Sequence, residues 1–166
     1  MIRDALAGLP TRPVLYLSLT VLVLGLGYHF LTTYQGCNSH AQLRGSLRAA
    51  IEANAGGAEP VRLASITEFP WDRADILVNY KPGGETTDCP FQWDWSRDTR
   101  EKLIAGDLLT VIVFLRDGKL VNYLEYPRDQ GDFVDVKNPY SPDSAVFRVA
   151  PSPTDPNGFI LTPTKG

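Results

Sequence analysis

Few residues in this 166-residue chain have the chemistry expected of a catalytic centre. There are only two histidines, and one of them, His29, falls inside a long apolar run, so a triad with histidine as general base is not readily built. The two cysteines, Cys37 and Cys89, do not combine with His29 or His40 at the spacing of zinc ligands. Glycine-rich phosphate-binding motifs and the G-x-S-x-G nucleophile motif are missing from the sequence. We therefore expect no catalytic residue, no metal site and no cofactor.

Carboxylates are the other groups that might carry chemistry. Asp129, Asp132 and Asp135 recur at every third position, which might suit the oxygen ligands of calcium, but the EF-hand pattern is absent. Aspartates that stabilise turns or face solvent are the simpler interpretation. Asp72 and Asp94 each adjoin a tryptophan and might form a glycosidase pair, but the sequence gives no geometry for residues so far apart. An envelope hydrolase is therefore the least favoured hypothesis.

Aromatic residues form a more informative group in the middle of the chain. Strand alternation would project Trp93 and Trp95 to the same face, with Asp94 between them on the other. Such rings either pack in a core or form a recognition surface, since tryptophan and tyrosine are enriched at binding hot spots and aromatic rings also stack on sugars. The candidate binding residues are Trp71, Asp72, Tyr80, Trp93, Asp94 and Trp95.

The compartment of these residues depends on an uncharged apolar run from Val14 to Leu31. Its roughly 18 residues span about 27 Å as a helix, close to the thickness of a bilayer core. A helix buried in a soluble core is the alternative, but such a helix at a chain terminus normally has a polar face. Arg3 and Arg12 precede the run and no basic residue follows it before Arg44, so the positive-inside rule places the amino terminus in the cytoplasm.

These features predict residues 1–12 in the cytoplasm, a transmembrane anchor over 13–34 in a bacterial inner membrane, and an extracytoplasmic domain over 35–166. Removal of the run as a signal peptide and lipidation of Cys37 stay open. No A-x-A-like site follows the run, however, and the residues before Cys37 match a lipobox only at Gly36. On the oxidising side of the membrane, a disulfide between Cys37 and Cys89 is expected, with two free thiols as the alternative.

Composition predicts one ordinary folded domain after the anchor. The chain is 43% hydrophobic and 21% charged, and about 130 residues are the usual size of one domain. Because only Arg3 and Arg12 among the 16 basic residues, and only Asp4 among the 19 acidic residues, precede position 35, the domain carries 14 basic and 18 acidic residues. This acidic balance argues against nucleic acid and anionic lipid surfaces as partners.

The elements of the domain follow from periodicity and turn residues. Ser39 and Gln42 resemble a capping box that would start a helix, and Gly56 and Gly57 would end it just after Asn54. A second short helix is expected from Ser96 to Ala105. Strands are predicted over Val61–Ile66, Ala74–Tyr80, Leu108–Tyr126 as a hairpin, Ala145–Val149 and Phe159–Thr162. The expected fold is α+β, with a mainly antiparallel sheet of about four to six strands packed by one or two helices.

The hairpin is the clearest local signal. Asp117 and Gly118 suit a two-residue type I′ turn, which pairs Arg116 with Lys119. An uninterrupted register then predicts two apolar faces. One face holds Val111, Val113, Leu115, Leu120 and Leu124, and the other holds Ile112, Phe114, Val121 and Tyr123.

A segment before the second strand carries a family resemblance. Phe69, Pro70, Trp71 and Asp72, followed by the strand Ile76–Tyr80, and later Tyr126-Pro127-Arg128 and Gly131-Asp132-Phe133, resemble uncharacterised bacterial envelope proteins with an F-x-W-D segment. The resemblance covers perhaps half of the chain. It implies an anchored or lipidated domain outside the cytoplasm, with no assigned activity, and it transfers no catalytic residue.

Three functions from different classes follow from these observations. The preferred hypothesis is a membrane-anchored module that binds a protein in the envelope, for example as an immunity or inhibitor protein, because a single anchor and a hairpin apolar on both faces suit an interaction protein. The alternative is a module that binds glycan or peptidoglycan through the tryptophans. An envelope hydrolase has only the scattered aspartates in its favour.

Overall fold

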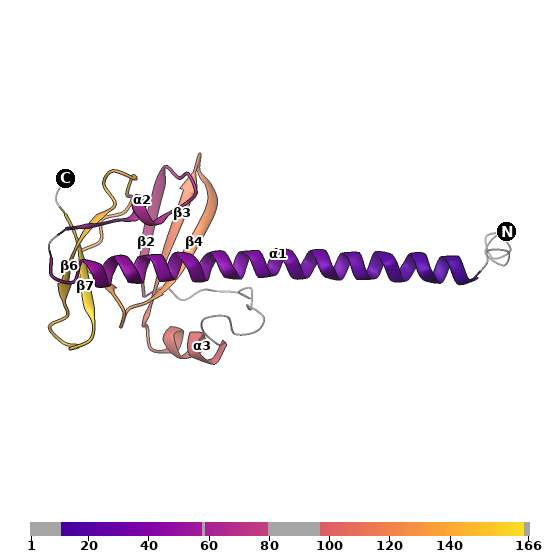
Figure 1. Cartoon of the computed structure of the whole chain (residues 1–166). Helices are drawn as coiled ribbons and strands as arrows, with labels where there is room; N and C mark the ends of the chain where they lie inside the picture. The colour runs from indigo at the N-terminus through magenta and orange to yellow at the C-terminus, as the bar shows by residue number, and fades with distance from the viewer. Residues whose placement is uncertain (1–10, 58, 80–96, 165–166) are drawn as a thin grey trace. The chain divides into compact units, whose positions relative to one another are not determined.

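The computed structural model describes residues 11–57, 59–79 and 97–164 (Figure 1). The chain divides into two compact units, Met1–Gly36 and Cys37–Gly166. Each unit is described by itself below.

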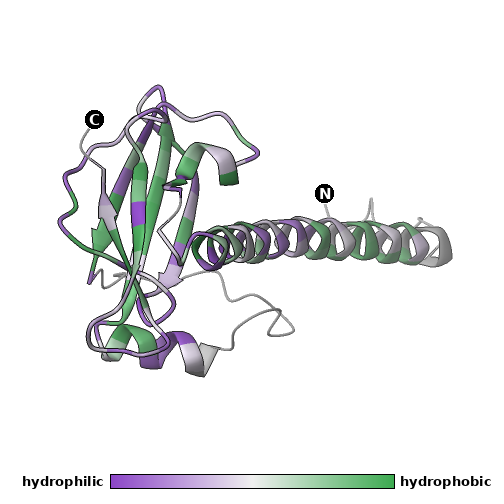
Figure 2. Cartoon of the chain, turned by 60° about the vertical axis from the view of Figure 1, so that its left-hand side comes forward, coloured by the Kyte–Doolittle hydropathy of each residue, from purple (hydrophilic) through white to green (hydrophobic). Residues whose placement is uncertain are grey.

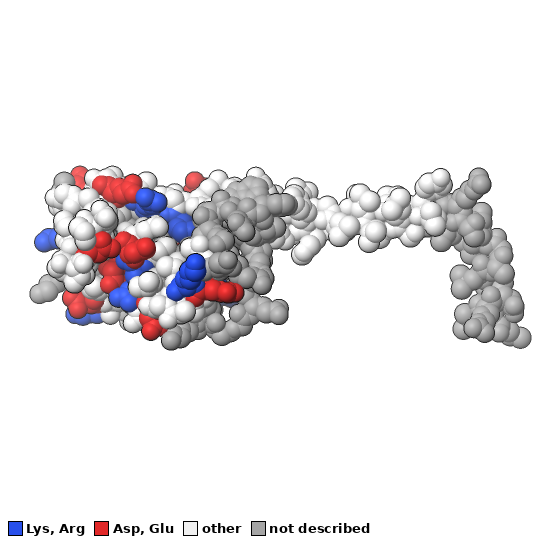
Figure 3. All heavy atoms as spheres, turned by 90° about the horizontal axis from the view of Figure 1, so that it is seen from below, with Lys and Arg blue, Asp and Glu red and all other residues white. Residues whose placement is uncertain are grey.

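The described residues of the first unit form the first part of helix α1, which runs from Thr11 to Ala53. The large apolar side chains from Leu15 to Leu31 are exposed, and Figure 3 shows that the described part of this stretch carries no charged side chain. The hydroxyls of Ser18 and Thr20 donate to carbonyls one turn earlier, at 2.9 and 2.8 Å, which satisfies them inside an apolar helix. This helix is long and apolar enough to cross a membrane, which confirms the expectation of a single candidate span.

The predicted start of a separate helix at Ser39 is wrong, because α1 continues through that position without interruption. No proline lies between Leu31 and Ala53, and continuing a helix adds one hydrogen bond per residue whereas a new helix must be nucleated. The predicted end is confirmed, since α1 stops at Ala53 and the N–H of Gly57 donates to the carbonyl of Asn54 at 2.8 Å. Gly57 has the positive φ expected there (70°).

The described residues of the second unit form the last part of α1, two sheets and two short helices, so the predicted α+β class is confirmed with the strands divided between two sheets. The first sheet has the order β1-β6-β7-β5, in which β5 is parallel to β7 and the other pairs are antiparallel. The second sheet is antiparallel, with the order β2-β3-β4. The elements are β1 Val61–Arg62, α2 Leu63–Ile66, β2 Arg73–Val78, α3 Arg97–Ala105, β3 Leu109–Arg116, β4 Lys119–Pro127, β5 Asp132–Phe133, β6 Val146–Pro151 and β7 Phe159–Pro163.

The strand predicted over Val61–Ile66 is only partly correct. It ends after Arg62, and the next residues form the helical turn α2. The turn buries Leu63 in the core and is closed by the hydroxyl of Ser65, which donates to the carbonyl of Arg62 at 2.8 Å. A serine bonded to the backbone in this way competes with strand pairing.

The β3–β4 hairpin has the predicted turn but not the predicted register. Asp117 and Gly118 both have positive φ (52° and 71°), as a type I′ turn requires. A bulge then places Leu115 opposite Leu120 and Phe114 opposite Asn122, so Val121 is the extra residue.

The bulge reverses the faces of the residues that follow it on β4. Leu124 pairs with Ile112 and is fully buried, and Tyr123 pairs with Val113. The predicted faces of Leu124 and Tyr123 are therefore wrong, because a shift of one residue turns every later side chain to the opposite face.

The core of the second unit is shared by both sheets and by α1. Phe114 from one sheet packs edge-on against Trp71 and Phe69, with ring centroids 5.3 Å apart in each case. In the other sheet, Phe147 packs against Phe133 at 5.1 Å. Figure 2 shows hydrophobic residues along the strands. The buried residues that α1 contributes are Leu43, Leu47 and Ile51, one helical turn apart.

Candidate binding surfaces

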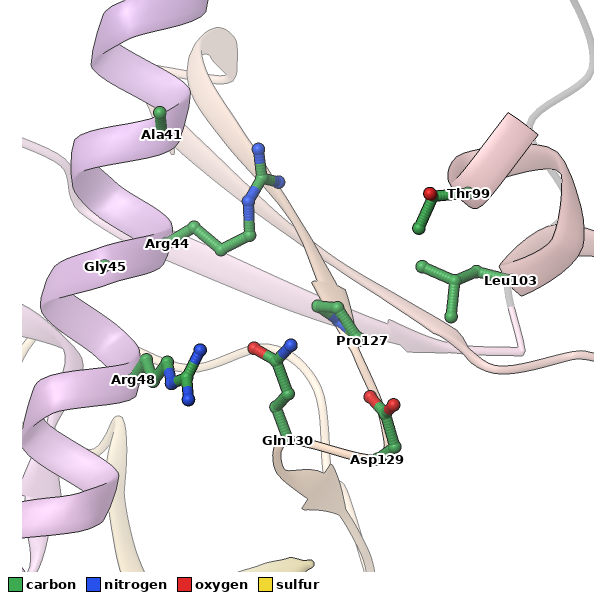
Figure 4. A pocket seen from close by; sticks show the side chains of 9 residues that line it. All are labelled: Ala41, Arg44, Gly45, Arg48, Thr99, Leu103, Pro127, Asp129 and Gln130. Atoms are coloured by element: carbon green, nitrogen blue, oxygen red, sulfur yellow. The ribbon is translucent and has the colours of Figure 1, made fainter. Parts of the chain in front are cut away.

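A groove lies between α1, α3 and the turn that follows β4 (Figure 4). Its volume is about 330 Å³, at the lower end of the range of ligand pockets. It is lined by Ala41, Arg44, Gly45 and Arg48 from α1, Thr99 and Leu103 from α3, and Pro127, Asp129 and Gln130.

An ion pair next to the groove holds α3 against β4. The Arg100 guanidinium binds both carboxylate oxygens of Glu125, at 2.7 and 2.5 Å, and the two side chains are only 16% and 11% exposed. This hydrogen bonding raises the pKa of Arg100. The carbonyl of Glu125 also accepts a hydrogen bond from Nη1 of Arg44 at 2.7 Å. Glu125 therefore connects both helical walls of the groove to the same strand.

Charged and polar side chains face each other across the groove. Nε of Arg48 pairs with Glu52 at 2.8 Å, but these side chains are 58% and 53% exposed, so water screens the pair. Figure 4 shows that the side chains of Arg48 and Gln130 point toward one another, with Asp129 farther along the turn. The groove thus has two arginines, Arg44 and Arg48, on the α1 wall and one carboxylate, that of Asp129, on the turn that follows β4.

The tip of the β3–β4 hairpin is a second surface of interest. Leu120 is 61% exposed and Val121 is 43% exposed. Both lie at the bulge, where a strand gains a residue without a partner. Leu115, which pairs with Leu120, is half-buried. The tip therefore presents a small apolar patch next to the turn.

The two outer strands of this sheet differ in how their edges are closed. Along β2, the side-chain amide of Asn138 bonds to both the N–H and the carbonyl of Ile76, each at 2.7 Å, and Ala74 pairs with Tyr140. Such protection is common at exposed sheet edges.

On β4, the bonds that the described residues make to the outer edge lie toward the carboxyl end of the strand. The Asn122 side chain accepts from the N–H of Tyr123 at 2.9 Å, and Arg44 binds the carbonyl of Glu125. Among the described residues, none bonds to the outer edge of β4 at Leu120 or Val121. The open part of the edge thus coincides with the exposed apolar side chains.

A third surface is a hollow of about 650 Å³ between the segment from Asp135 to Ser144 and strands β6 and β7. Its lining combines hydroxyl groups, carboxylates and prolines. The aromatic ring in that lining belongs to Tyr140, which is buried and whose hydroxyl accepts from the N–H of Lys137 at 2.8 Å. The hollow therefore does not offer the exposed aromatic face on which a sugar ring stacks.

Of the residues that the sequence predicted to bind, the structure assigns Trp71 to the core. It is 8% exposed, packs against Phe114 and donates from Nε1 to the hydroxyl of Thr67 at 2.9 Å. Asp72 is exposed, but its carboxylate accepts from the N–H of Asp117 at 2.7 Å and so stabilises the hairpin turn. Tyr80, Trp93, Asp94 and Trp95 lie outside the described residues.

The other predicted sites have simpler structural roles in the described part of the chain. Cys37 is buried and disulfide-bonded; the sequence has one other cysteine, Cys89, which lies outside the described residues, so their pairing stays a prediction. Asp132 is engaged by Arg128, whose guanidinium binds both of its carboxylate oxygens at 2.7 Å. Over residues 11–57, 59–79 and 97–164, no three or more His, Cys, Asp or Glu side chains are grouped so that they would hold a metal ion.

The sequence did not identify the residues that build the groove. Arg44 and Arg48 are four residues apart on one helix, a spacing that places them on the same face, and this signal was available. The pairing of Arg100 with Glu125 joins residues 25 positions apart, and only the folded chain brings them together.

One buried hydroxyl near the groove is expected to reduce stability. Tyr126 is fully buried and its hydroxyl has no hydrogen-bond partner among the described residues. Burial raises the pKa of Tyr126 well above its usual value. Because an unpartnered buried hydroxyl costs free energy, we expect Tyr126→Phe to raise the free energy of unfolding by about 1 kcal/mol near neutral pH.

The difference in the free energy of unfolding between Tyr126→Phe and the unaltered protein should widen above about pH 10. The unfolded tyrosine ionises there, whereas the buried one stays neutral, so the unaltered protein loses stability as the pH rises and the variant avoids this loss. Denaturant unfolding of both proteins at pH 7 and pH 10.5 measures the effect. A clear loss of stability in the variant at pH 7 would show that the hydroxyl has a partner.

The described residues thus define a small α+β domain that follows one helix long and apolar enough to cross a membrane. The domain presents a groove with two arginines and, at the opposite end of β4, an apolar hairpin tip beside an open strand edge. No protein family matches the chain, and neither the curated proteins nor the solved structures contain a match.

Proposed function

We propose that this chain is a single-pass protein of the bacterial inner membrane whose domain outside the cytoplasm binds another protein of the envelope. The apolar, uncharged stretch of α1 from Val14 to Leu31 supports the anchor, and Arg3 and Arg12 before that stretch support the orientation. Mixed charges over the surface of the domain, interspersed in Figure 3, favour neither nucleic acid nor an anionic lipid surface.

The apolar hairpin tip is the observation that carries the binding function. Leu120 and Val121 expose their side chains at the start of β4, next to the turn, where solvent-facing positions are ordinarily polar. Burying one such side chain against a partner contributes about 1.5 to 3 kcal/mol. Exposed apolar side chains contribute little to the stability of the fold. A partner that buries Leu120 and Val121 would gain binding free energy from them.

The open edge beside the tip indicates how the partner binds. An extended segment that adds to β4 at Leu120 and Val121 would pair with backbone groups there and cover both apolar side chains. The closed edge of β2, where Asn138 occupies the backbone groups of Ile76, gives no such opportunity. We therefore infer that the partner contributes an extended, apolar segment.

The orientation is tested by fusing alkaline phosphatase after Gly166 in a bacterial host. The enzyme needs an oxidising compartment, so we expect an active fusion. Activity of only a cytoplasmic reporter at this position would reject the proposed topology.

The binding surface is tested with a photo-crosslinking amino acid in native membranes. Placed at Leu120 or Val121, it should yield a protein adduct. Placed at Arg148, an exposed residue of β6 in the other sheet, it should not. Protein adducts of equal yield at all three positions, or an adduct with cell-wall glycan instead, would reject the hairpin tip as a protein-binding surface.

A further inference from the structure

We infer that the groove between α1 and α3 is a second binding site, one that takes a single carboxylate group of a peptide on Arg48. This site is distinct from the hairpin tip, because the two lie at opposite ends of β4. At about 3.3 Å per residue, the length of β4 separates them by roughly 25 Å.

The walls of the groove are fixed before any ligand arrives. The Arg100–Glu125 ion pair holds α3 to β4, and the bond from Arg44 to the carbonyl of Glu125 holds α1 to the same strand. A preformed site binds more tightly than one that must be ordered, since less conformational freedom is lost.

The α1 wall has donors that suit a carboxylate. Arg48 uses only Nε in its exposed contact with Glu52. Its two terminal nitrogens have no partner among the described residues, and a guanidinium presents these donors in a fork that matches the two oxygens of a carboxylate. Figure 4 shows the amide oxygen of Gln130 on the side toward Arg48 and its nitrogen on the far side, so the donors for the carboxylate are the two terminal nitrogens of Arg48.

The shape of the groove suits a peptide segment. Ala41 and Gly45 make the α1 wall shallow, and a Cβ placed on Gly45 would meet no atom within 4 Å. A ligand backbone can therefore approach the helix closely. Leu103 and Pro127 provide an apolar surface for the rest of the ligand.

Asp129 limits the charge that the ligand can carry. It lines the same groove outside the arginine wall, so a second negative charge on the ligand would be repelled. The ligand class is therefore a peptide with one carboxylate rather than a polyanion.

The test uses the full-length protein in detergent micelles and a blocked tripeptide, acetyl-Ala-Glu-Ala-amide, monitored through the NMR amide signals of Gly45 and Gln130. We expect saturable shifts with this peptide. Because a charge-assisted hydrogen bond is lost, acetyl-Ala-Gln-Ala-amide should bind at least about tenfold more weakly. Acetyl-Ala-Gln-Ala with a free carboxyl end tests whether a carboxyl-terminal carboxylate binds as tightly as the glutamate side chain. Binding of either carboxylate supports the site.

Matched variants separate the groove from general charge effects. Arg48→Gln should weaken binding of the glutamyl peptide about tenfold or more. Arg148→Gln removes one exposed positive charge outside the groove and should leave the affinity unchanged. Absence of saturable shifts, equal binding of the glutamyl and glutaminyl peptides, or unaltered affinity in Arg48→Gln would each overturn the inference.

Discussion

Leu124→Ala should lower the free energy of unfolding by about 2 to 5 kcal/mol, the usual cost of deleting a large buried side chain. Leu124 is fully buried and pairs with Ile112 across the hairpin. Val121→Ala, three residues earlier on the same strand, should change stability by less than about 1 kcal/mol, because Val121 is already 43% exposed.

The two variants are compared by denaturant unfolding of the full-length protein in one detergent. Leu120→Ala serves as a second exposed control at the tip. The comparison tests the bulge directly, because an uninterrupted register would place Leu124 on the same face as Leu120. Equal costs at Leu124 and Val121 would contradict the bulge and the core built on it.

This hairpin shows which features local sequence can predict. Asp117 and Gly118 specify the turn, since few residue pairs accept positive φ at both positions. Nothing in the strand sequence specifies that Val121 is extra, because that choice depends on which register buries more apolar area against the other sheet and α1. The α+β class could therefore be predicted, whereas the faces of β4 could not.

The same limit applies to the candidate sites. Trp71 stood in an aromatic stretch that suited either a core or a binding surface, and its contacts with Phe114 and Thr67 decide for the core. The groove is built from three separate parts of the chain, of which only the spacing of Arg44 and Arg48 is visible locally. A sequence shows which reactive or charged side chains are present. Which of them come together in one site depends on contacts between residues far apart in the chain.

Breaking the Arg100–Glu125 ion pair is expected to cause the second large loss of stability. Glu125→Gln keeps the shape of the side chain but removes its charge, which leaves the Arg100 guanidinium mostly buried without a counter-ion. Breaking a buried ion pair in this way typically costs about 3 to 5 kcal/mol. Because 16% of Arg100 remains accessible to water, we expect a loss at or just below the lower end of that range, about 2 to 3 kcal/mol.

A matched control and a double variant identify the cause of this loss. Glu52→Gln also removes a carboxylate from an arginine partner, but the Arg48–Glu52 pair is exposed, so its cost should stay below about 1 kcal/mol. Arg100→Met combined with Glu125→Gln should recover much of the stability, since no uncompensated charge is then buried. Denaturant unfolding of the unaltered protein, Arg100→Met, Glu125→Gln and the double variant completes the cycle. If the double variant is as unstable as the sum of its single changes, the two residues do not act as a pair, and α3 must be held against β4 by other contacts.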